Sequence, residues 1–408
     1  MTGQSASPTC WWEQPGVLHR VVCDLLNAEL TTMRRRPLLH TLPWPNELHL
    51  IRDLGADSLE LLSLATSLSE LLHIHRSGIE DYLLARLEIQ DWVSVAYTSL
   101  RQHSADITFS TSGSSGTPKR CEHSLASLQQ EISELSVLFD GRRRVLSAVP
   151  AHHIYGFLFT VLLPQALSIK AEQIIDVRTS SPGALLSAMQ PGDLVIGHPD
   201  YWQNLARLAR ALPDNVVGVT SGAPCPNAVA IDMRAAGLNK LVQIFGSSET
   251  AGIGWRDDET APYTCFAYWQ AQDDGAALAR RMPDGATARF TLQDHLTWQD
   301  ENHFRPAGRR DQVVQVGGIN VFPARAAKVI AQHPAVQDVV VRLMRADEGN
   351  RLKAFVVPRA GYEDDLMLAE TLAEWASAGL SAAERPATYT FGAALPRQSN
   401  GKPADWII

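Results

Sequence analysis

Lysine and cysteine are scarce in this sequence, and it has no excess of positive charge and no long hydrophobic run. Its 408 residues hold six lysines against thirty arginines, and five scattered cysteines without a CxxC pair. That cysteine pattern argues against a zinc site or a disulfide framework and fits a reducing, cytoplasmic compartment. The net charge of −8 disfavours broad binding to nucleic acid or anionic membranes. No apolar segment approaches the roughly 20 residues of a membrane span, and the first residues lack the pattern of a signal peptide.

The first hundred residues have the periodicity of helices. Apolar residues recur at helical spacing over residues 16–30 and again after residue 57. Asp57 can cap the second of these helices, with Glu60 three residues later as its partner. The leucines that follow fall on one helical face; they are Leu61, Leu64, Leu68 and Leu71.

After residue 105 the pattern changes to short apolar strands that alternate with helical stretches. We expect strands within residues 106–113, 144–151, 193–199, 215–224 and 241–249. This alternation predicts an α/β core with a mainly parallel sheet, whose ligands bind at the carboxyl ends of the strands. After residue 308 the strands shorten, which predicts a small α+β domain.

One loop stands out by its composition. Residues 110–120 read STSGSSGTPKR, and we place them between a strand and the helix that follows. Backbone N–H groups in such a turn form a nest for an anion, and glycine lets a phosphate approach closely. Lys119 adds a compact positive charge. A flexible Ser/Gly linker explains this stretch equally well when it is taken alone.

Five motifs in order extend this reading. The loop TSGSSGTPK is followed by VPAHHIYGF, SGAP with QIFGSSET, GRRDQVVQVGGINVFP and LPRQSNGKPADW. Together they closely resemble the adenylate-forming superfamily of acyl- and aryl-CoA ligases, over residues 106–408. The resemblance implies ATP and Mg²⁺ as cofactors and a carboxylic acid as substrate. The acid would be activated as an acyl-AMP and passed to a thiol of coenzyme A or of an acyl carrier protein.

The resemblance also assigns roles to individual residues. The phosphate loop would comprise Thr111, Ser112, Gly113, Ser114, Ser115, Gly116 and Lys119. The remaining nucleotide contacts would be Gly222, Ala223, Pro224, Phe245, Gly246, Asp294 and Arg309, with Phe245 stacked on adenine. The catalytic residues would be His153 beside the acyl pocket, Ser248 at the α-phosphate, Glu249 as the Mg²⁺ ligand, and Lys402. Asp311 would be the hinge. In the alternative interpretation, His153 is a core histidine.

The helical N-terminal region resembles an acyl carrier protein over residues 15–100. DSL at the start of a helix is the attachment site of 4′-phosphopantetheine in that family, which would be Ser58. Residues 46–91 hold nine acidic residues and three arginines, a net charge of −6, and carrier proteins meet basic partners through such helices. This reading implies a phosphopantetheinyl transferase as partner. In the alternative, Ser58 is an ordinary first-turn residue.

These observations predict three domains: a carrier-like helical bundle over residues 1–100, a shortened adenylate-forming core over 101–308, and a mobile C-terminal α+β domain over 309–408. The leading hypothesis is an ATP-dependent ligase for a small aryl acid, with its own carrier domain among the candidate acceptors. In the other hypothesis the chain is a non-catalytic carrier or scaffold with a degenerate ligase-like region. Its best support is the short segment ahead of the phosphate loop, since family members carry a longer one.

Overall fold

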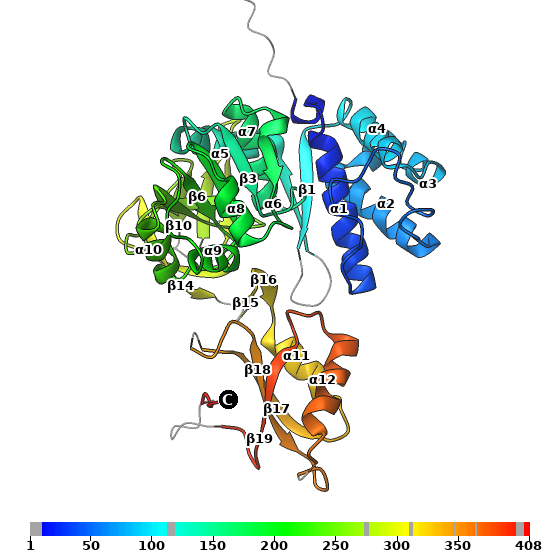
Figure 1. Cartoon of the computed structure of the whole chain (residues 1–408), viewed down its shortest axis with the longest axis vertical. Helices are drawn as coiled ribbons and strands as arrows, with labels where there is room; N and C mark the ends of the chain where they lie inside the picture. The colour runs from blue at the N-terminus through cyan, green and yellow to red at the C-terminus, as the bar shows by residue number, and fades with distance from the viewer. Residues whose placement is uncertain are drawn as a thin grey trace, which may run out of the picture. The chain divides into compact units, whose positions relative to one another are not determined.

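The computed structural model describes residues 10–111, 119–272, 277–309, 313–345, 347–363, 365–396 and 404–408. The chain divides into two compact units (Figure 1). Unit 1 consists essentially of the residues up to 306, and unit 2 mainly of residues 307–408. Among the described helices, none is both long and apolar enough to cross a membrane.

Helices make up the N-terminal part of unit 1, as the periodicity predicted. They are η1 (Trp11–Glu13), α1 (Val17–Arg34), α2 (Ser58–Leu72), η2 (Ile74–Ser77), α3 (Tyr82–Ala85) and α4 (Ile89–Leu100). The predicted cap of α2 is confirmed, because the Asp57 carboxylate accepts from the N–H groups of Leu59 and Glu60. The Glu60 carboxylate accepts in turn from the Asp57 N–H at 3.1 Å, and it also pairs with Arg34 at the end of α1.

A mixed sheet forms the centre of unit 1. In the described residues it has nine strands in the order β13-β14-β9-β8-β7-β6-β5-β3-β4. The parallel part consists of β3 (Arg144–Ser147), β4 (Ile174–Asp176), β5 (Asp193–Gly197), β6 (Val217–Thr220) and β7 (Lys240–Ser247). The other four strands are β8 (Ala251–Arg256), β9 (Tyr263–Cys265), β13 (Asp294–Trp298) and β14 (His303–Arg309). The predicted α/β core with a parallel sheet is therefore present, extended by an antiparallel part.

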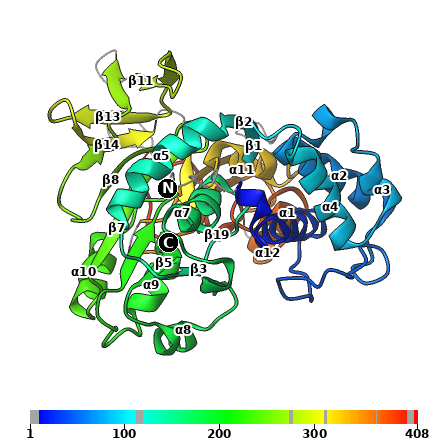
Figure 2. The same cartoon turned by 90° about the horizontal axis from the view of Figure 1, so that it is seen from above.

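Helices cover both faces of this sheet (Figure 2). Side chains of Leu146 and Val195 pack toward α8 (Pro182–Ala188), α9 (Pro199–Ala206) and α10 (Asn227–Ala235). Their neighbours Val145 and Ile196 point to the other face, which is covered by α5 (Leu125–Leu138), α6 (Ile154–Phe157), η3 (Leu158–Leu162) and α7 (Leu163–Ala166). Unit 1 also contains η4 (Ala171–Gln173) and a three-stranded sheet of β10 (Trp269–Gln272), β11 (Ala277–Arg281) and β12 (Thr287–Thr291).

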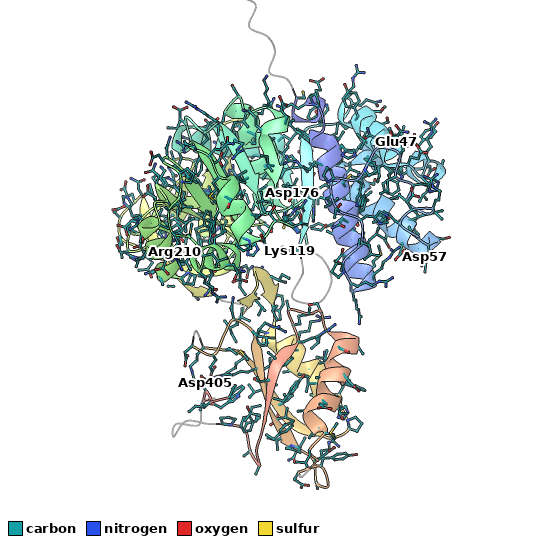
Figure 3. All side chains as sticks on the ribbon, viewed as in Figure 1. Glu47, Asp57, Lys119, Asp176, Arg210 and Asp405 are labelled. Carbon is teal, nitrogen blue, oxygen red and sulfur yellow. The ribbon has the colours of Figure 1, made fainter. Side chains whose placement is uncertain are left out.

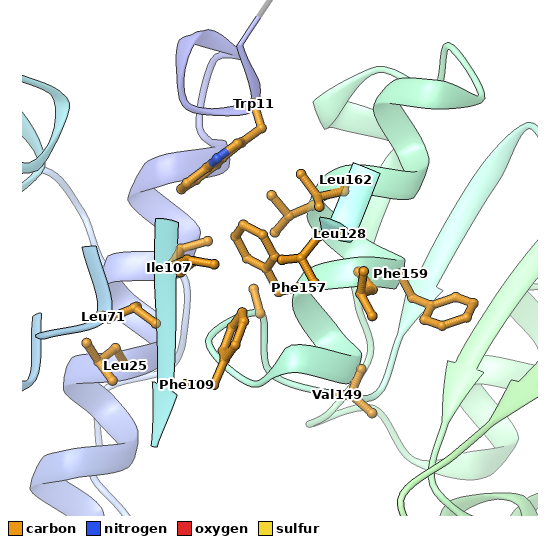
Figure 4. Close-up of a cluster of buried hydrophobic side chains, with 14 of the residues drawn as sticks. Trp11, Leu25, Leu71, Ile107, Phe109, Leu128, Val149, Phe157, Phe159 and Leu162 are labelled. Atoms are coloured by element: carbon orange, nitrogen blue, oxygen red, sulfur yellow. The ribbon is translucent and has the colours of Figure 1, made fainter. Parts of the chain in front are cut away.

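The hairpin β1 (Asp106–Thr111) and β2 (Lys119–Ser124) joins the N-terminal helices to the core. Figure 4 shows β1 between Leu25 and Leu71 of the helices and Phe157 of α6. The ring of Phe109 on β1 lies 5.5 Å from that of Phe157. All of these side chains belong to one hydrophobic cluster. The first hundred residues therefore do not form a compact unit of their own, and the predicted boundary near residue 100 does not coincide with a boundary between the units.

Unit 2 is a small α+β arrangement, as predicted for the C-terminal region. Its elements are β15 (Val314–Val316), β16 (Ile319–Val321), α11 (Pro323–Ile330), β17 (Val336–Leu343), β18 (Leu352–Pro358), α12 (Leu368–Gly379) and β19 (Pro386–Phe391). β17 and β18 pair antiparallel, and β19 adds parallel to β18. The helices bury Ile330, Leu372 and Ala376 in a core separate from that of unit 1.

The shared core of unit 1 gives a test. Leu26 on α1 is fully buried in the same cluster as Val219 of β6. We expect Leu26→Ala to lower the free energy of unfolding by about 2–5 kcal/mol and to reduce protection from hydrogen exchange in β6 as well as in α1. Leu59→Ala, at an exposed position of α2, should change stability by about 0.5 kcal/mol or less. Unchanged protection in β6 would mean that the helices fold independently.

Candidate active site

The carboxyl ends of the parallel strands meet at one edge of the sheet in unit 1, and the predicted motifs follow them. Pro150 to His153 follow β3, Ser221 to Pro224 follow β6, and Ser248 and Glu249 follow β7. The Ser221 hydroxyl donates to the carbonyl of Ile244 at 2.9 Å, which ties the end of β6 to β7. The sheet topology thus brings three of the motifs together, as expected for an open α/β sheet.

Lys119 and Glu249 form an ion pair at this edge. Lys119 Nζ lies 2.6 Å from Glu249 Oε1, although 130 residues separate them in the chain. Burial raises the pKa of Glu249, but the bond from Lys119 and the local hydrogen bonds outweigh it, so this pKa lies below its usual value. Glu249 also raises the pKa of Lys119. Both groups are therefore charged at neutral pH, and the lysine of the first motif contacts the carboxylate of the third.

The position of Lys119 corrects one prediction. We expected the glycine-rich segment between a strand and a helix, but Lys119 begins β2, which pairs with β1 before α5 starts. The segment therefore connects two antiparallel strands. The sequence did carry a signal for β2, because Cys121 and His123 are buried and alternate with exposed residues. That strand is short and polar, and the pattern is easily missed.

His123 on β2 is a site residue that sequence reasoning missed. It is buried, and its Nε2 donates to the carbonyl of Ser248 at 2.7 Å. Burial lowers the pKa of His123, so the ring is neutral at pH 7 and carries its proton on Nε2. The hairpin thus contacts the turn after β7 twice, through the side chain of Lys119 and through His123.

Phe245 lies in an aromatic cluster near the end of β7. It is half-buried, and its ring centroid lies 5.6 Å from Tyr263 and 5.4 Å from Phe304. The next residue is Gly246, where a Cβ would lie 2.1 Å from the carbonyl oxygen of Ala251. The bulge between β7 and β8 at this point therefore requires glycine. Phe245 is only half-buried, so part of it remains accessible to a ligand.

The two adjacent histidines after β3 differ in exposure. His152 is buried, whereas His153 is exposed, and their rings lie 4.2 Å apart. His153 precedes the first turn of α6. His152, rather than His153, is the buried member of the pair. Desolvation nevertheless lowers the pKa of His153, so protein surrounds this solvent-accessible ring. An exposed imidazole at the sheet edge is compatible with contact to a substrate.

The structure describes the remaining predicted site residues only in part. Asp294 begins β13 and is half-buried. Thr111 ends β1 and Arg309 ends β14, but their side chains are not described. Three stretches of the prediction lie outside the described residues altogether: the phosphate-loop residues Ser112, Gly113, Ser114, Ser115 and Gly116, the hinge Asp311, and Lys402.

Two buried charged residues hold the turn that carries Glu249. Glu131 on α5 is fully buried and accepts from the Gly252 N–H at 3.0 and 3.1 Å. A Cβ at Gly252 would lie 2.3 Å from that carboxylate. Arg280 lies over the ring of Tyr268 and donates to the carbonyl of Thr250. The backbone on the C-terminal side of Glu249 is thus fixed from two directions.

Away from this edge, His73, Asp106 and Glu122 place three potential metal ligands within 4.8 Å of one another. Arg76 donates to Asp106 at 2.7 Å and to Glu122 at 3.0 Å. Because this guanidinium already pairs with both carboxylates, the cluster is an ion-pair network of the protein's own side chains. Glu249 at the sheet edge, whose side chain is 31% exposed, is the better candidate for a Mg²⁺ ligand.

Comparison with known proteins agrees with this geometry. Residues 67–267 match the family model of the AMP-binding enzymes, and residues 327–402 match the AMP-binding enzyme C-terminal domain. A 4-coumarate–CoA ligase of Cereibacter sphaeroides is 38% identical over 377 residues, covering 89% of this chain and 87% of that protein. This chain belongs to the AMP-binding enzyme family. It is an acid–thiol ligase of the adenylate-forming type, which activates a carboxylic acid with ATP, and Mg²⁺ fits that chemistry.

Other relatives and solved structures agree. A 4-coumarate–CoA ligase of Halorhodospira halophila is 37% identical over 347 residues, 85% of this chain and 87% of that protein. The amide bond synthetase McbA from Marinactinospora thermotolerans has a TM-score of 0.61 at 18% identity, covering 95% of this chain and 93% of that chain. The o-succinylbenzoate CoA synthetase from Bacillus subtilis has a TM-score of 0.62 at 14% identity, covering 95% and 92%. These structures support the fold.

The comparisons also bear on the N-terminal helices. The family match begins at residue 67, inside α2, and therefore includes residues that we had assigned to a carrier-like domain. The chain covers 87% of each of the two coumarate ligases. A short segment ahead of the phosphate loop is thus no evidence that the enzyme has degenerated.

The buried Glu131 predicts a pH-dependent stability. Burial raises the pKa of Glu131 to about 7, whereas an exposed glutamate titrates near 4.3. Between these values the folded chain keeps a proton that the unfolded chain releases, so stability falls as pH rises toward 7 and the penalty is complete above it. Glu131→Gln removes this charge. We expect the melting temperature of the variant, relative to the wild type, to be higher at pH 8 than at pH 5.

Thermal unfolding at the two pH values measures this difference. Glu134→Gln on the same helix is the control, since Glu134 is only half-buried, and it should show a much smaller difference between the two pH values. Equal shifts for Glu131→Gln at pH 5 and pH 8 would contradict the assignment.

Proposed function

We propose that this enzyme activates a hydroxycinnamate-type aryl carboxylic acid and transfers it to coenzyme A. In the first step the acid carboxylate attacks the α-phosphorus of ATP, which gives an acyl-adenylate and releases pyrophosphate. In the second step the coenzyme A thiolate attacks the acyl carbon and releases AMP. The substrate class is supported by the names of the relatives at 37–38% identity, which are 4-coumarate–CoA ligases.

The observation that carries this proposal is the contact between Lys119 and Glu249. Two anions must meet in the first step, so the site needs positive charge near the phosphates and a carboxylate for Mg²⁺. Lys119 supplies the first, and Glu249 is the candidate for the second. In the chain without ligands each neutralises the other, and MgATP would bring a new partner to both.

The other predicted residues have roles consistent with this scheme. Ser248, held through its carbonyl by His123, would contact the α-phosphate. Phe245 would stack on adenine beside the Gly222–Pro224 segment. Asp294 and Arg309 would bind the ribose, Lys402 would bridge the acid and the α-phosphate, and Asp311 would be the pivot between the two steps.

A panel of acids tests the proposal. With MgATP and coenzyme A, hydroxycinnamates should give more AMP and thioester than hydroxybenzoates or fatty acids of similar size.

Lys402→Ala should lower adenylate formation by about 10²-fold or more, the scale for one preorganised electrostatic contact, while transfer from preformed acyl-AMP falls much less. Lys328→Ala, at an exposed position of α11, is the control. A clear preference for fatty acids, or equal losses in both steps, would overturn the assignment.

A second acceptor remains a candidate because of Ser58. This residue is exposed at the first position of α2, directly after the capping Asp57. Figure 3 shows Asp57 at the outer end of this helix, pointing away from the sheet. An exposed serine in a DSL sequence is open to a phosphopantetheinyl transferase, and a thiol attached there would have an effective concentration on the order of mM.

Intact mass distinguishes the two acceptors. If Ser58 carries the arm, co-expression with an active transferase should raise the mass by roughly 340 Da, the size of an arm attached through a hydroxyl. Ser58→Ala should abolish this increase, whereas Ser63→Ala, at another exposed position of α2, should not. An unmodified wild-type chain would leave coenzyme A or a separate carrier protein as the acceptor.

A further inference from the structure

The carboxylate of Asp24 on α1 is almost completely buried and has partners on two distant segments. Its side chain is 2% exposed. Oδ1 lies 2.5 Å from Nη2 of Arg178, and Oδ2 accepts from the N–H of Ala151 at 2.7 Å. Burying a carboxylate is expensive unless it is paired and hydrogen-bonded. The position of Asp24 therefore depends on both contacts being made, and both lie outside its own helix.

The segment held by Asp24 leads directly to His153. Ala151 is fully buried and stands two residues before His153, between the end of β3 and the start of α6. A Cβ at Gly156 would lie 1.8 Å from the carbonyl oxygen of Pro150, so the first turn of α6 packs directly on this segment. The backbone of residues 150–151 is thus enclosed between Asp24 on one side and Gly156 on the other.

Arg178 fixes the Asp24 carboxylate from the side of β4. It follows Asp176, the last residue of that strand, and its guanidinium bonds both Asp24 and Asp176. Burial lowers the pKa of Arg178, but the carboxylates of Asp24 and Asp176 raise it by more. The guanidinium is therefore always charged. A planar guanidinium between two carboxylates restricts the direction of each. Asp24 consequently has little freedom to follow the backbone of residue 151 if that backbone moves.

We propose that Asp24 is a positioning residue for the acid substrate: through the N–H of Ala151 it fixes the segment that presents His153 at the carboxyl edge of the sheet. This inference rests on the proposed function, since it takes His153 to lie beside the acyl pocket. In this proposal the N-terminal helix α1 contributes to binding of the acid. The nucleotide motifs after β6 and β7 make no described contact with Asp24, so binding of ATP should be independent of it.

A purely structural role for Asp24 is the rival explanation, and the chain offers a matched control. Asp193 is also 2% exposed and pairs with an arginine, Arg144, at 2.7 Å. It accepts a backbone N–H from Gln190 at 2.8 Å. Asp193 is the first residue of β5 and Arg144 the first of β3, so this pair lies at the amino ends of the strands. The two carboxylates are equally buried, and each pairs with an arginine and a backbone N–H. They differ in the segment they hold, which lies at the carboxyl edge of the sheet for Asp24 and at the amino edge for Asp193.

The test compares Asp24→Asn with Asp193→Asn in the full chain, at a temperature where both are folded. Both should lower the melting temperature. Only Asp24→Asn should raise the KM for the acid, by about tenfold or more, as misplacement of a positioning segment does, with the KM for ATP within about twofold of the wild type. Arg178→Lys keeps the charge but loses the planar fork, so it should raise the KM for the acid by less than Asp24→Asn does. This variant tests the proposal if Asp24→Asn does not fold.

Hydrogen exchange supplies a readout that does not depend on turnover. Asp24→Asn should increase exchange in residues 149–157 relative to Asp193→Asn. Equal acid KM values in the two variants, or equal exchange in this segment, would overturn the positioning role. Absence of acid-dependent AMP release by the wild type with every aryl acid would instead overturn the proposed function, and the exchange experiment would still decide the role of Asp24.

Discussion

The burial of β1 between two layers is the constraint on which the site in unit 1 depends. On one face of this strand, Thr108 bonds Nε2 of the buried His73 at 2.8 Å. On the other face, Phe109 packs against Phe157. Because β1 pairs with β2 in a fixed register, packing that fixes β1 also fixes Lys119 and His123. The N-terminal helices thereby support residues that contact the turn after β7, which explains why they share one core with the sheet.

Electrostatics accounts for the state of the site before substrates bind. Glu249 loses part of its solvation by burial, and the contact with Lys119 compensates for that loss, whereas the Lys119 side chain is itself half-exposed. MgATP carries both signs of charge. In the proposed reaction each residue therefore exchanges one opposite charge for another, phosphate for Lys119 and Mg²⁺ for Glu249. In that proposal the two residues pair with each other when no nucleotide is bound, and MgATP would replace their contact.

Local signals in the sequence predicted the helices and their caps correctly, but they did not predict which elements pack against them. The capping of α2 by Asp57 and Glu60 was correct, since it depends on four consecutive residues. The same four residues suggested a carrier bundle, yet a cap carries no information about what its helix packs against. The leucine face of α2 was also correct, and it packs in the core shared with the sheet. The alternation of apolar strands and helical stretches predicted the α/β core, and the motifs predicted residues at the strand ends, but neither predicted the hairpin that carries Lys119.

Residues that act through the backbone of others left no pattern in the sequence. Asp24, His123 and Glu131 are each buried, each lies in a helix or a strand, and each bonds a backbone group more than 100 residues away. Only the three-dimensional structure shows such contacts, because the partner is a peptide group that every residue has. Burial is what makes them informative, because a buried carboxyl group such as Asp24 or Glu131 needs hydrogen-bond partners whether it is charged or protonated. Asp24 bonds the segment before His153, and Glu131 bonds the backbone three residues after Glu249. In the proposed mechanism these are parts of the backbone that must be held in place, so the buried carboxyl groups would support the residues that contact the substrates.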